Sequence, residues 1–238
     1  MLLGARIAVV VPAHDEAPRI RRVIERMPAF VDRIVVVDDA SRDETCAIVR
    51  ACEEPRVHLV RHTNNRGVGA SIATGYRTAR EDGAEVIAVM AGDDQMDPGD
   101  LEAVVTPVAR HEADYVKGDR IHHLEARVMP LTRRVGTTTL GVLTRWAVRA
   151  PGLSDSQCGY TAISGDAVDR IDLSSLWPRF GYPNDLLGLI ARRGLRIAQV
   201  PVRPVYQGEP SELRAWHVAT VIALIARAAW RVRRPPRP

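Results

Sequence analysis

Four side chains with oxygen donors follow one apolar run in the middle of the chain. Residues 86–98 have the sequence VIAVMAGDDQMDP, so Asp93, Asp94 and Gln95 come directly after the end of an expected buried strand. In open α/β sheets ligands bind beyond the carboxyl ends of the strands, and a divalent cation that holds a diphosphate needs clustered oxygens there. Adjacent carboxylates repel each other unless a counter-ion is present. This stretch therefore predicts a metal site, whereas Asp97, which is followed by proline, is expected to cap the next helix.

Short runs of β-branched residues alternate with helical patterns, which predicts an α/β fold with a parallel sheet and crossover helices. Strands are expected at residues 7–11, 34–37, 57–60, 86–89, 113–117 and 195–202, and helices at residues 17–27, 43–51 and 68–82, with a further helix opening at Tyr182. Polar or glycine-rich segments follow the first four strands, at residues 12–16, 38–45, 64–70 and 93–97. Capping and turn formation explain one such loop, but four in succession predict a binding site at one edge of the sheet.

Two of these loops suit a nucleotide. Asp39, or alternatively Asp38, can accept hydrogen bonds from the N–H groups of a nucleobase. The glycines of residues 67–70 let the backbone approach a ligand closely. This segment lacks the third glycine and the distant acidic residue of the dinucleotide fingerprint, so NAD binding is not expected.

Composition narrows the class of protein. A chain of 238 residues is long enough for one large α/β domain, with or without a terminal appendage. The net charge is +4 and only Lys117 among the 33 basic residues is lysine, so the arginine enrichment indicates overall composition more than a nucleic-acid surface. Three cysteines without paired spacing favour a reducing cytoplasm. Residues 1–12 lead straight into a strand and are not expected to be a signal peptide.

The segments VVVPAHDE, VVVDDASRDET, NNRGVGASIATGYRTA and MAGDDQMDP resemble inverting family 2 glycosyltransferases of the A-type fold, and within them polyprenyl-phosphate sugar transferases such as dolichol-phosphate mannose synthase. The resemblance covers residues 7–211 and implies the nucleotide-diphospho-sugar transferase fold, with a mostly parallel central sheet flanked by helices. It also implies which residues surround the donor nucleotide, namely Pro12, His14, Glu16, Asp38, Asp39, Gly67 and Asp93.

The metal region of that family has the pattern Asp-x-Asp-x-Gln, and this chain has Ala91 in place of the first aspartate. By the resemblance, Asp93 and Gln95 are the protein ligands of Mg²⁺ or Mn²⁺. The site would then have one protein ligand fewer and an additional water.

The same resemblance suggests acceptor residues. Gly118-Asp119-Arg120 is similar to the family's Gly-Ser-Arg segment, in which the arginine faces the lipid phosphate, although Asp119 departs from it. The segment MPLTRRVGTTTL resembles the start of the family's interfacial helix and places Arg133 and Thr137 one turn apart, a spacing that suits a phosphate. A solvated helix end with an ordinary arginine is the alternative for these two residues.

Residues 154–160 resemble the family's Asp-x-x-Ser-Gly-Phe segment, which lines the sugar and acceptor pocket and implies a catalytic role for Asp155. A buried aspartate that caps the backbone of Gln157 or Gly159 is the alternative. Cys158 is expected to be packed. Asp185 faces the acceptor by the resemblance, or simply starts a helix.

The end of the chain departs most from the family. Gln207, Glu209 and Glu212 occupy the arginine, glycine and lysine positions of the closing Arg-x-x-Gly-x-Ser-Lys loop. Contacts to the donor phosphates would then have to come from Arg203 or Arg214.

Residues 215–230, AWHVATVIALIARAAW, have an apolar core shorter than the roughly 20 residues of a transmembrane helix. An alternative to an interfacial helix is one packed on the sheet or on a second copy. The expected domains are a catalytic domain at residues 1–210 and an amphipathic helix with a basic tail at residues 211–238. The aromatic and basic residues that favour an anionic membrane surface are Trp216, Trp230, Arg231, Arg233, Arg234 and Arg237.

These observations predict an inverting glycosyltransferase that moves a sugar from a nucleotide diphosphate to a polyprenyl phosphate at the inner face of the cell membrane. A phosphate acceptor is already ionised near neutral pH, so catalysis would rest on positioning and electrostatics. The residues expected to supply them are Asp93, Asp155, Arg120 and Arg133.

Two alternatives stay open. With a soluble acceptor, Asp155 or Asp185 would have to act as a base. A nucleotide-sugar-binding protein without activity is the other. A nucleotidyltransferase is disfavoured because no GxGTR-type loop follows the first strand, and a homo-oligomer is compatible with the sequence.

Overall fold

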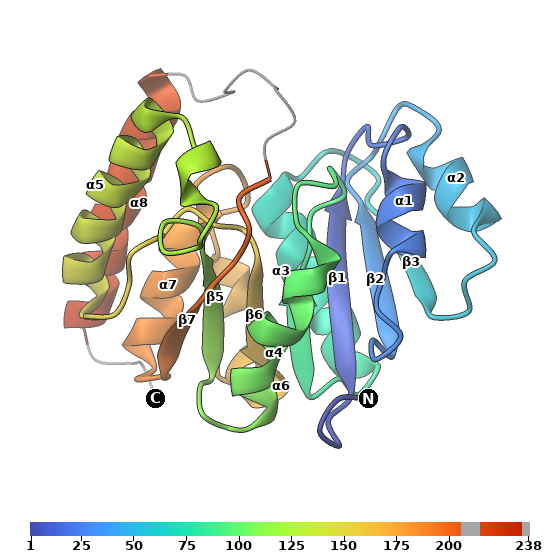
Figure 1. Ribbon diagram of the computed structural model, residues 1–238, viewed down its shortest axis with the longest axis horizontal. Helices are drawn as coiled ribbons and strands as arrows, with labels where there is room; N and C mark the ends of the chain where they lie inside the picture. The colour runs from blue at the N-terminus through green and yellow to red at the C-terminus, as the bar shows by residue number, and fades with distance from the viewer. Residues whose placement is uncertain (206–214, 235–238) are drawn as a thin grey trace.

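The computed structural model describes residues 1–205 and 215–234. Within them, seven strands form a sheet in the order β3-β2-β1-β4-β6-β5-β7 (Figure 1). β6 runs antiparallel to its neighbours β4 and β5, whereas the other strand pairs are parallel. The strands are β1 (Ile7–Ala13), β2 (Arg33–Asp38), β3 (Val57–Arg61), β4 (Val86–Val89), β5 (Tyr115–Asp119), β6 (Thr161–Ser164) and β7 (Ile197–Pro201).

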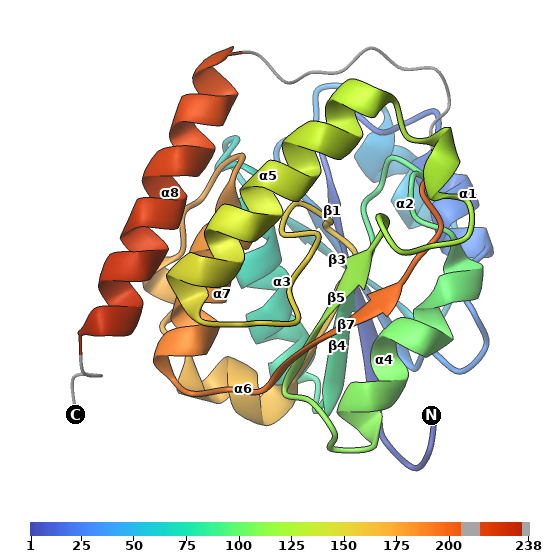
Figure 2. The same ribbon diagram turned by 60° about the vertical axis from the view of Figure 1, so that its left-hand side comes forward.

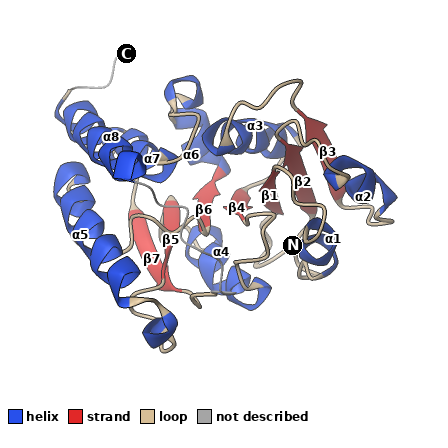
Figure 3. Cartoon of the chain, turned by 90° about the horizontal axis from the view of Figure 1, so that it is seen from above, coloured by secondary structure: helices blue, strands red, loops and turns tan. Residues whose placement is uncertain are grey.

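Helices cover both faces of this sheet, as the view from above shows (Figure 3). The α-helices are α1 (Ile20–Glu25), α2 (Thr45–Ala51), α3 (Val68–Glu81), α4 (Leu101–Ala109), α5 (Leu131–Val148), α6 (Gly165–Arg170), α7 (Tyr182–Arg192) and α8 (Ala215–Arg233). The 3₁₀ turns are η1 (Pro98–Asp100), η2 (Ala126–Val128) and η3 (Leu173–Ser175).

The sheet separates two hydrophobic cores because successive residues of a strand face opposite sides. Ile7 and Val9 of β1 pack in the core formed with α1, α2 and α4. Ala8 and Val10 pack in the other core, with α3, α6 and α7. Burial on both faces explains why these strands are continuous apolar runs in the sequence.

The predicted fold class is confirmed, and six of the seven strands lie where the sequence predicts them. β6 is absent from the predicted strands. Its four residues, Thr161–Ser164, form no long β-branched run, and the strand lies between β4 and β5 through tertiary pairing. The helix predicted at residues 17–27 is shorter, because α1 begins at Ile20.

α8 packs against α7 on one side, and Figure 2 shows α5 beside it. A Cβ on Gly188 would lie 2.7 Å from the Cβ of Ala228, so the two helix backbones approach closely. Val221 and Leu224 are buried on the same side of α8. The predicted boundary at residue 210 stays a prediction, because it lies outside the described residues together with Gln207, Glu209, Glu212, Arg214 and Arg237.

The role expected for Arg231 is wrong. Its side chain is buried and lies 3.2 Å from the carboxylate of Asp185, instead of facing outward with Arg233 and Arg234. Arg231 also donates to the carbonyl oxygen of Ser175 at 2.8 Å. Through these contacts with α7 and the η3 turn, Arg231 holds α8 against the rest of the domain. Among the described residues no helix combines the length and apolar character needed to cross a membrane.

Candidate active site

The loops after β1 and β2 are joined by hydrogen bonds. The backbone N–H of Asp15 donates to Ser41 Oγ at 3.0 Å, and that of Glu16 donates to Thr45 Oγ1 at 2.8 Å. The capping-type residues after β2 therefore bind the neighbouring loop rather than only their own helix. These bonds give the edge of the sheet a fixed shape without a ligand.

The backbone is strained at the same edge. Asp15, Ala40 and Asp94 follow β1, β2 and β4, and their φ angles are 55°, 59° and 57°. Residues other than glycine adopt this left-handed region at a cost of about 1–3 kcal/mol, and such residues cluster at functional sites. Three of the six such residues in the described part of the chain lie at adjacent strand ends, at the edge where the sequence predicts the site.

Asp39 is buried and holds the loop after β3. Its carboxylate lies 2.7 Å from His62 Nδ1 and accepts the backbone N–H groups of Arg66 (2.9 Å) and Gly67 (2.6 Å). Burial raises the pKa of Asp39, but these hydrogen bonds together hold the pKa below its usual range. His62, which the sequence analysis missed, is fixed on its other side by Thr74 Oγ1 at 3.0 Å. Only its position directly after β3, the strand beside β2, could have signalled the pair.

The two glycines after β3 approach the chain's own backbone. A Cβ on Gly67 would lie 2.5 Å from the carbonyl oxygen of Pro178, and one on Gly69 would lie 2.2 Å from that of Trp177. Gly67 also has φ +94°. The start of α3 thus packs tightly on residues 177–178, which accounts for these glycines before any ligand is considered.

Asp38 is fully buried and also has internal partners. Arg61 Nε lies 3.2 Å from its carboxylate, the Cys46 thiol donates to it at 3.2 Å, and the Ser41 N–H donates at 3.3 Å. Burial, together with this carboxylate, raises the pKa of the Cys46 thiol. A carboxylate has about four acceptor positions, so Asp38 and Asp39 each retain room for a further donor. Contact of either with a nucleobase stays a prediction.

His14 links three of the loops. Its Nδ1 lies 2.9 Å from the carbonyl oxygen of Asp39, and its Nε2 lies 3.2 Å from Asn65 Nδ2. The N–H of Gly92 donates to the carbonyl oxygen of Pro12 at 3.2 Å, which joins the β1 loop to the loop after β4. The structure therefore brings the donor-binding candidates to one sheet edge: Pro12, His14, Glu16, Asp38, Asp39, Gly67 and Asp93.

The two adjacent carboxylates after β4, Asp93 and Asp94, have different environments. The carboxylate of Asp94 is buried and lies 3.2 Å from Nε of Arg22 in α1 and 3.1 Å from Arg26, which caps the end of α1. Asp93 accepts the N–H of Gln95 at 3.1 Å and is half-buried. Asp94 is thus held by arginines, and Asp93 and Gln95 stay the predicted ligands.

Arg120 and Asp155, predicted separately, form one ion pair. Arg120 Nε lies 2.8 Å from Asp155 Oδ2, and a terminal nitrogen of Arg120 lies 3.1 Å from Oδ1. Asp155 is fully buried and also accepts the N–H groups of Gln157 and Cys158, both at 3.0 Å. Burial alone would raise the pKa of Asp155, but Arg120, followed by Lys117, holds the pKa below its usual range.

Lys117 was missed as a site residue. It is fully buried on β5, and its ammonium group donates to the carbonyl oxygen of Cys158. Burial lowers the pKa of Lys117 to about 8. Its signal was its uniqueness among the basic residues. A hydrogen bond from Lys117 to Cys158 and an ion pair between Arg120 and Asp155 thus hold residues 155–158 against the end of β5.

The remaining acceptor candidates lie on helices. Arg133 is half-buried and Thr137 is buried, one turn apart on α5. Asp185 does not face an acceptor, because its carboxylate lies beneath α8, 3.2 Å from Arg231 and 3.5 Å from Arg227. Burial raises the pKa of Asp185 in spite of these arginines.

Comparison with known proteins assigns the family. The model described as glycosyl transferase family 2 matches residues 8–168, more than half of the chain. The chain belongs to this family. A UDP-N-acetylglucosamine–dolichyl-phosphate N-acetylglucosaminyltransferase of Methanococcus voltae is 29% identical, over 84% of this chain and 86% of the relative. An undecaprenyl-phosphate mannosyltransferase of Micrococcus luteus is also 29% identical, over 83% of this chain and 82% of the relative.

Solved structures share the fold of this glycosyltransferase. Glucosyl-3-phosphoglycerate synthase from Mycobacterium tuberculosis, solved with Mn²⁺, UDP and glucosyl-3-phosphoglycerate, has a TM-score of 0.71 at 21% identity. The match covers 98% of this chain and 82% of that one. It confirms the A-type glycosyltransferase architecture predicted from the sequence.

The oxygen atoms that this glycosyltransferase offers after β4 suit a divalent metal whose other coordination positions are filled by a diphosphate. Asp93 offers a carboxylate and Gln95 an amide oxygen, while no group of three or more His, Cys, Asp or Glu side chains in residues 1–205 and 215–234 is arranged to hold a metal ion. Mg²⁺ commonly uses one or two carboxylates and fills its other positions with waters and substrate phosphates. The two predicted ligands after β4 match that pattern.

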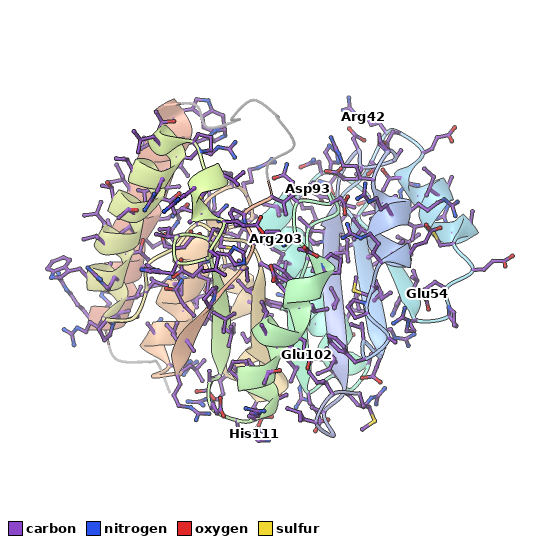
Figure 4. The ribbon with its side chains drawn as sticks, in the orientation of Figure 1. Arg42, Glu54, Asp93, Glu102, His111 and Arg203 are labelled. Carbon is purple, nitrogen blue, oxygen red and sulfur yellow. The ribbon has the colours of Figure 1, made fainter. Side chains whose placement is uncertain are left out.

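Arg203, which follows β7, lies at the same edge of the molecule as Asp93, whereas His111 lies at the opposite edge (Figure 4). The guanidinium of Arg203 lies 3.2 Å from the carboxylate of Asp97 and 2.9 Å from that of Glu125. A hollow of about 320 Å³ opens beside it, lined in part by Arg22, Arg26 and Asp94. Asp97 itself accepts the N–H of Gly99 at 2.9 Å, which confirms the predicted cap.

Proposed function

We propose that this chain is an inverting glycosyltransferase that transfers one sugar from a nucleotide diphosphate to a polyprenyl phosphate. The observation that carries the proposal is that two carboxylates are paired with arginines. Asp155 and Asp185, the carboxylates that the sequence analysis named as possible bases for a hydroxyl acceptor, are both held by arginines in buried ion pairs. A phosphate acceptor needs no base, and relatives of this chain are named for dolichyl and undecaprenyl phosphates.

In the proposed mechanism the two halves of the site bind separate substrates. The loops after β1, β2 and β3 bind the nucleotide, and Asp93 and Gln95 would hold Mg²⁺ or Mn²⁺. When bound, the metal would supply positive charge that stabilises the departing diphosphate. Arg120 and Arg133 orient the acceptor phosphate so that its oxygen attacks the anomeric carbon from the side opposite the diphosphate, which inverts the configuration.

The exposed faces of α5 and α8 support a membrane-bound acceptor. Figures 1 and 2 show the two helices side by side at one end of the molecule. The guanidinium of Arg234 lies 3.9 Å from the ring centre of Trp230, and that of Arg233 lies 5.6 Å from the ring of Trp146. Large exposed apolar residues on this surface are Leu131, Val135, Val142, Leu143, Trp146, Trp216, Val218, Ile222 and Trp230. Exposed tryptophans beside arginines are typical of surfaces that bind the interface of anionic membranes.

Transfer assays with matched acceptors test the proposal. The chain is incubated with a panel of nucleotide sugars, Mn²⁺ or Mg²⁺, and either a short-chain polyprenyl phosphate or the corresponding polyprenol. We expect a sugar-phosphate-polyprenol product with at least one donor and no transfer to the alcohol. Transfer only to hydroxyl acceptors, or donor binding without turnover across the panel, would refute it.

A further inference from the structure

A histidine beside Arg120 is held by a buried carboxylate. His122 Nδ1 lies 2.6 Å from Oδ2 of Asp119, whose residue is only 5% exposed. Asp119 also accepts the backbone N–H of Ile121 at 2.8 Å and the hydroxyl of Ser154. Four donors, with the N–H of His122 at 3.3 Å, fix this carboxylate and therefore the orientation of the ring.

The other ring nitrogen faces outward. The side chain of His122 is 66% exposed, and within the described residues its Nε2 makes no hydrogen bond. A carboxylate on Nδ1 holds that nitrogen as the N–H donor, so a second proton on the ring has its place at Nε2. The same pairing of carboxylate and imidazole orients histidines in hydrolases and metal sites.

The Asp119–His122 pair is bonded to the acceptor half of the site. Asp119 bonds Ser154 and Arg120 bonds Asp155, so the last residue of β5 and the residue after it hold two neighbouring residues of the loop before β6. His122 and Arg120 lie on the same short turn after β5. Charged and titratable groups on the elements around this turn include Lys117, His123, the Arg120–Asp155 pair, and Arg203 with Glu125 at 2.9 Å and with Asp97 at 3.2 Å.

We infer that protonated His122 is a second contact for the phosphate of the acceptor, with Asp119 as its positioning residue. The inference rests on the proposed function, because it assigns a partner to the acceptor of that reaction. Imidazolium Nε2–H donates to a phosphate oxygen, while Arg120 supplies the permanent charge. This role would explain why the chain has Asp119 where the Gly-Ser-Arg pattern has serine, because a serine carries no negative charge to face an imidazolium.

Three substitutions at the pair and one remote control test the inference. His122→Gln removes the titratable cation and should raise the acceptor KM about tenfold at pH 6.5, with kcat and donor KM within twofold of wild type. His122→Arg keeps a positive charge at this position and should restore a low acceptor KM. Asp119→Ser should give a smaller rise than His122→Gln. His111→Asn, at the opposite edge of the sheet, should leave all three constants unchanged.

The outcomes separate this inference from the proposed function. If wild type transfers sugar to a short-chain polyprenyl phosphate and His122→Gln has the wild-type acceptor KM, the inference fails alone. A fall in kcat with unchanged acceptor KM would assign His122 to the chemical step and overturn the binding role. If wild type uses only hydroxyl acceptors, the proposed function fails and the inference fails with it.

Discussion

The donor and acceptor halves of this site are held together by a different balance of interactions. At the ends of β1 to β3, carboxylates and hydroxyls mostly accept backbone N–H groups, as Asp39 does from Gly67 and Ser41 does from Asp15, and the arginine that pairs with Asp38 there, Arg61, is half exposed. At the end of β5, full charges face each other, as Arg120 and Asp155 do. Beneath α8, Asp185 and Arg231 repeat that arrangement.

The difference has a physical consequence. Hydrogen bonds to backbone groups fix loop shape at a modest cost and leave acceptor positions for a ligand. Buried ion pairs bring a larger desolvation cost, and removal of one partner leaves an uncompensated charge. We therefore expect substitutions in the donor half to affect turnover more than folding, and substitutions in the acceptor half to affect both.

Removal of α8 should have the largest effect. Deletion of residues 214–238 exposes the surface under Val221, Leu224 and Ile225 and leaves Asp185 without its arginines. Burial of three large aliphatic side chains contributes roughly 5–9 kcal/mol, comparable to the stability of a whole domain. The truncated chain should aggregate or lose its cooperative thermal transition, whereas deletion of residues 235–238 alone should not change it. A truncated protein that melts like wild type would show that α8 is a separable anchor.

Asp93→Ala tests the donor half. Loss of the carboxylate ligand should lower metal-dependent turnover about 1,000-fold, roughly 4 kcal/mol in the barrier, while the melting temperature stays close to that of wild type. Ala91→Asp, which restores the family's first aspartate, should keep or strengthen metal binding. Wild-type rates in Asp93→Ala at saturating Mn²⁺ would remove Asp93 from the site.

Arg120→Met tests the acceptor half. The substitution leaves Asp155 buried without its cation and should cost about 3 kcal/mol of stability, measured by denaturant unfolding, in addition to weaker acceptor use. The double variant Arg120→Met with Asp155→Asn removes both charges and should recover part of that stability. Equal stability of Arg120→Met and wild type would mean that the pair is not formed in solution.

Acid unfolding tests the hydrogen bonds of the donor half. Because the pKa of Asp39 is lowered in the folded protein, its contribution is present above the unfolded value of about 3.9 and is lost as the pH falls below it. Asp39→Asn should flatten the fall in stability between pH 5 and 3 by about 1 kcal/mol. Asp166→Asn, whose side chain is 92% exposed, is the control and should keep the wild-type slope. An unchanged slope in Asp39→Asn would contradict the assigned bonds.

Trp146→Ala should have the smallest effect on folding, because its side chain is exposed on α5. Binding to anionic vesicles should weaken about fivefold, roughly 1 kcal/mol, and the melting temperature should stay the same. Leu3→Ala, an exposed apolar residue far from α5 in the sequence, serves as the control in the same sedimentation assay. Vesicle binding that is absent in wild type, or indifferent to Trp146, would leave α5 and α8 as a surface for another partner.

The two halves also differed in how far the sequence predicted them. Strand ends followed by His14, Asp39 and Asp93 could be recognised because each motif is contiguous and the parallel sheet brings its ends together. The pair of Arg120 and Asp155, 35 residues apart, could not be predicted as a contact, because it depends on where β6 enters the sheet. His62 and Lys117 were not predicted as site residues for the same reason, since their partners come from other strands and loops.

The central claim is that the acceptor is a phosphate, attacked without help from a side-chain base. The most direct measurement is a competition in which wild type receives equal amounts of a short-chain polyprenyl phosphate and its polyprenol with a productive nucleotide sugar, and the product's anomeric configuration is read by NMR. We predict a single glycosyl phosphate of inverted configuration and no glycosylated alcohol. A glycoside of the alcohol, or a product of retained configuration, would contradict this account.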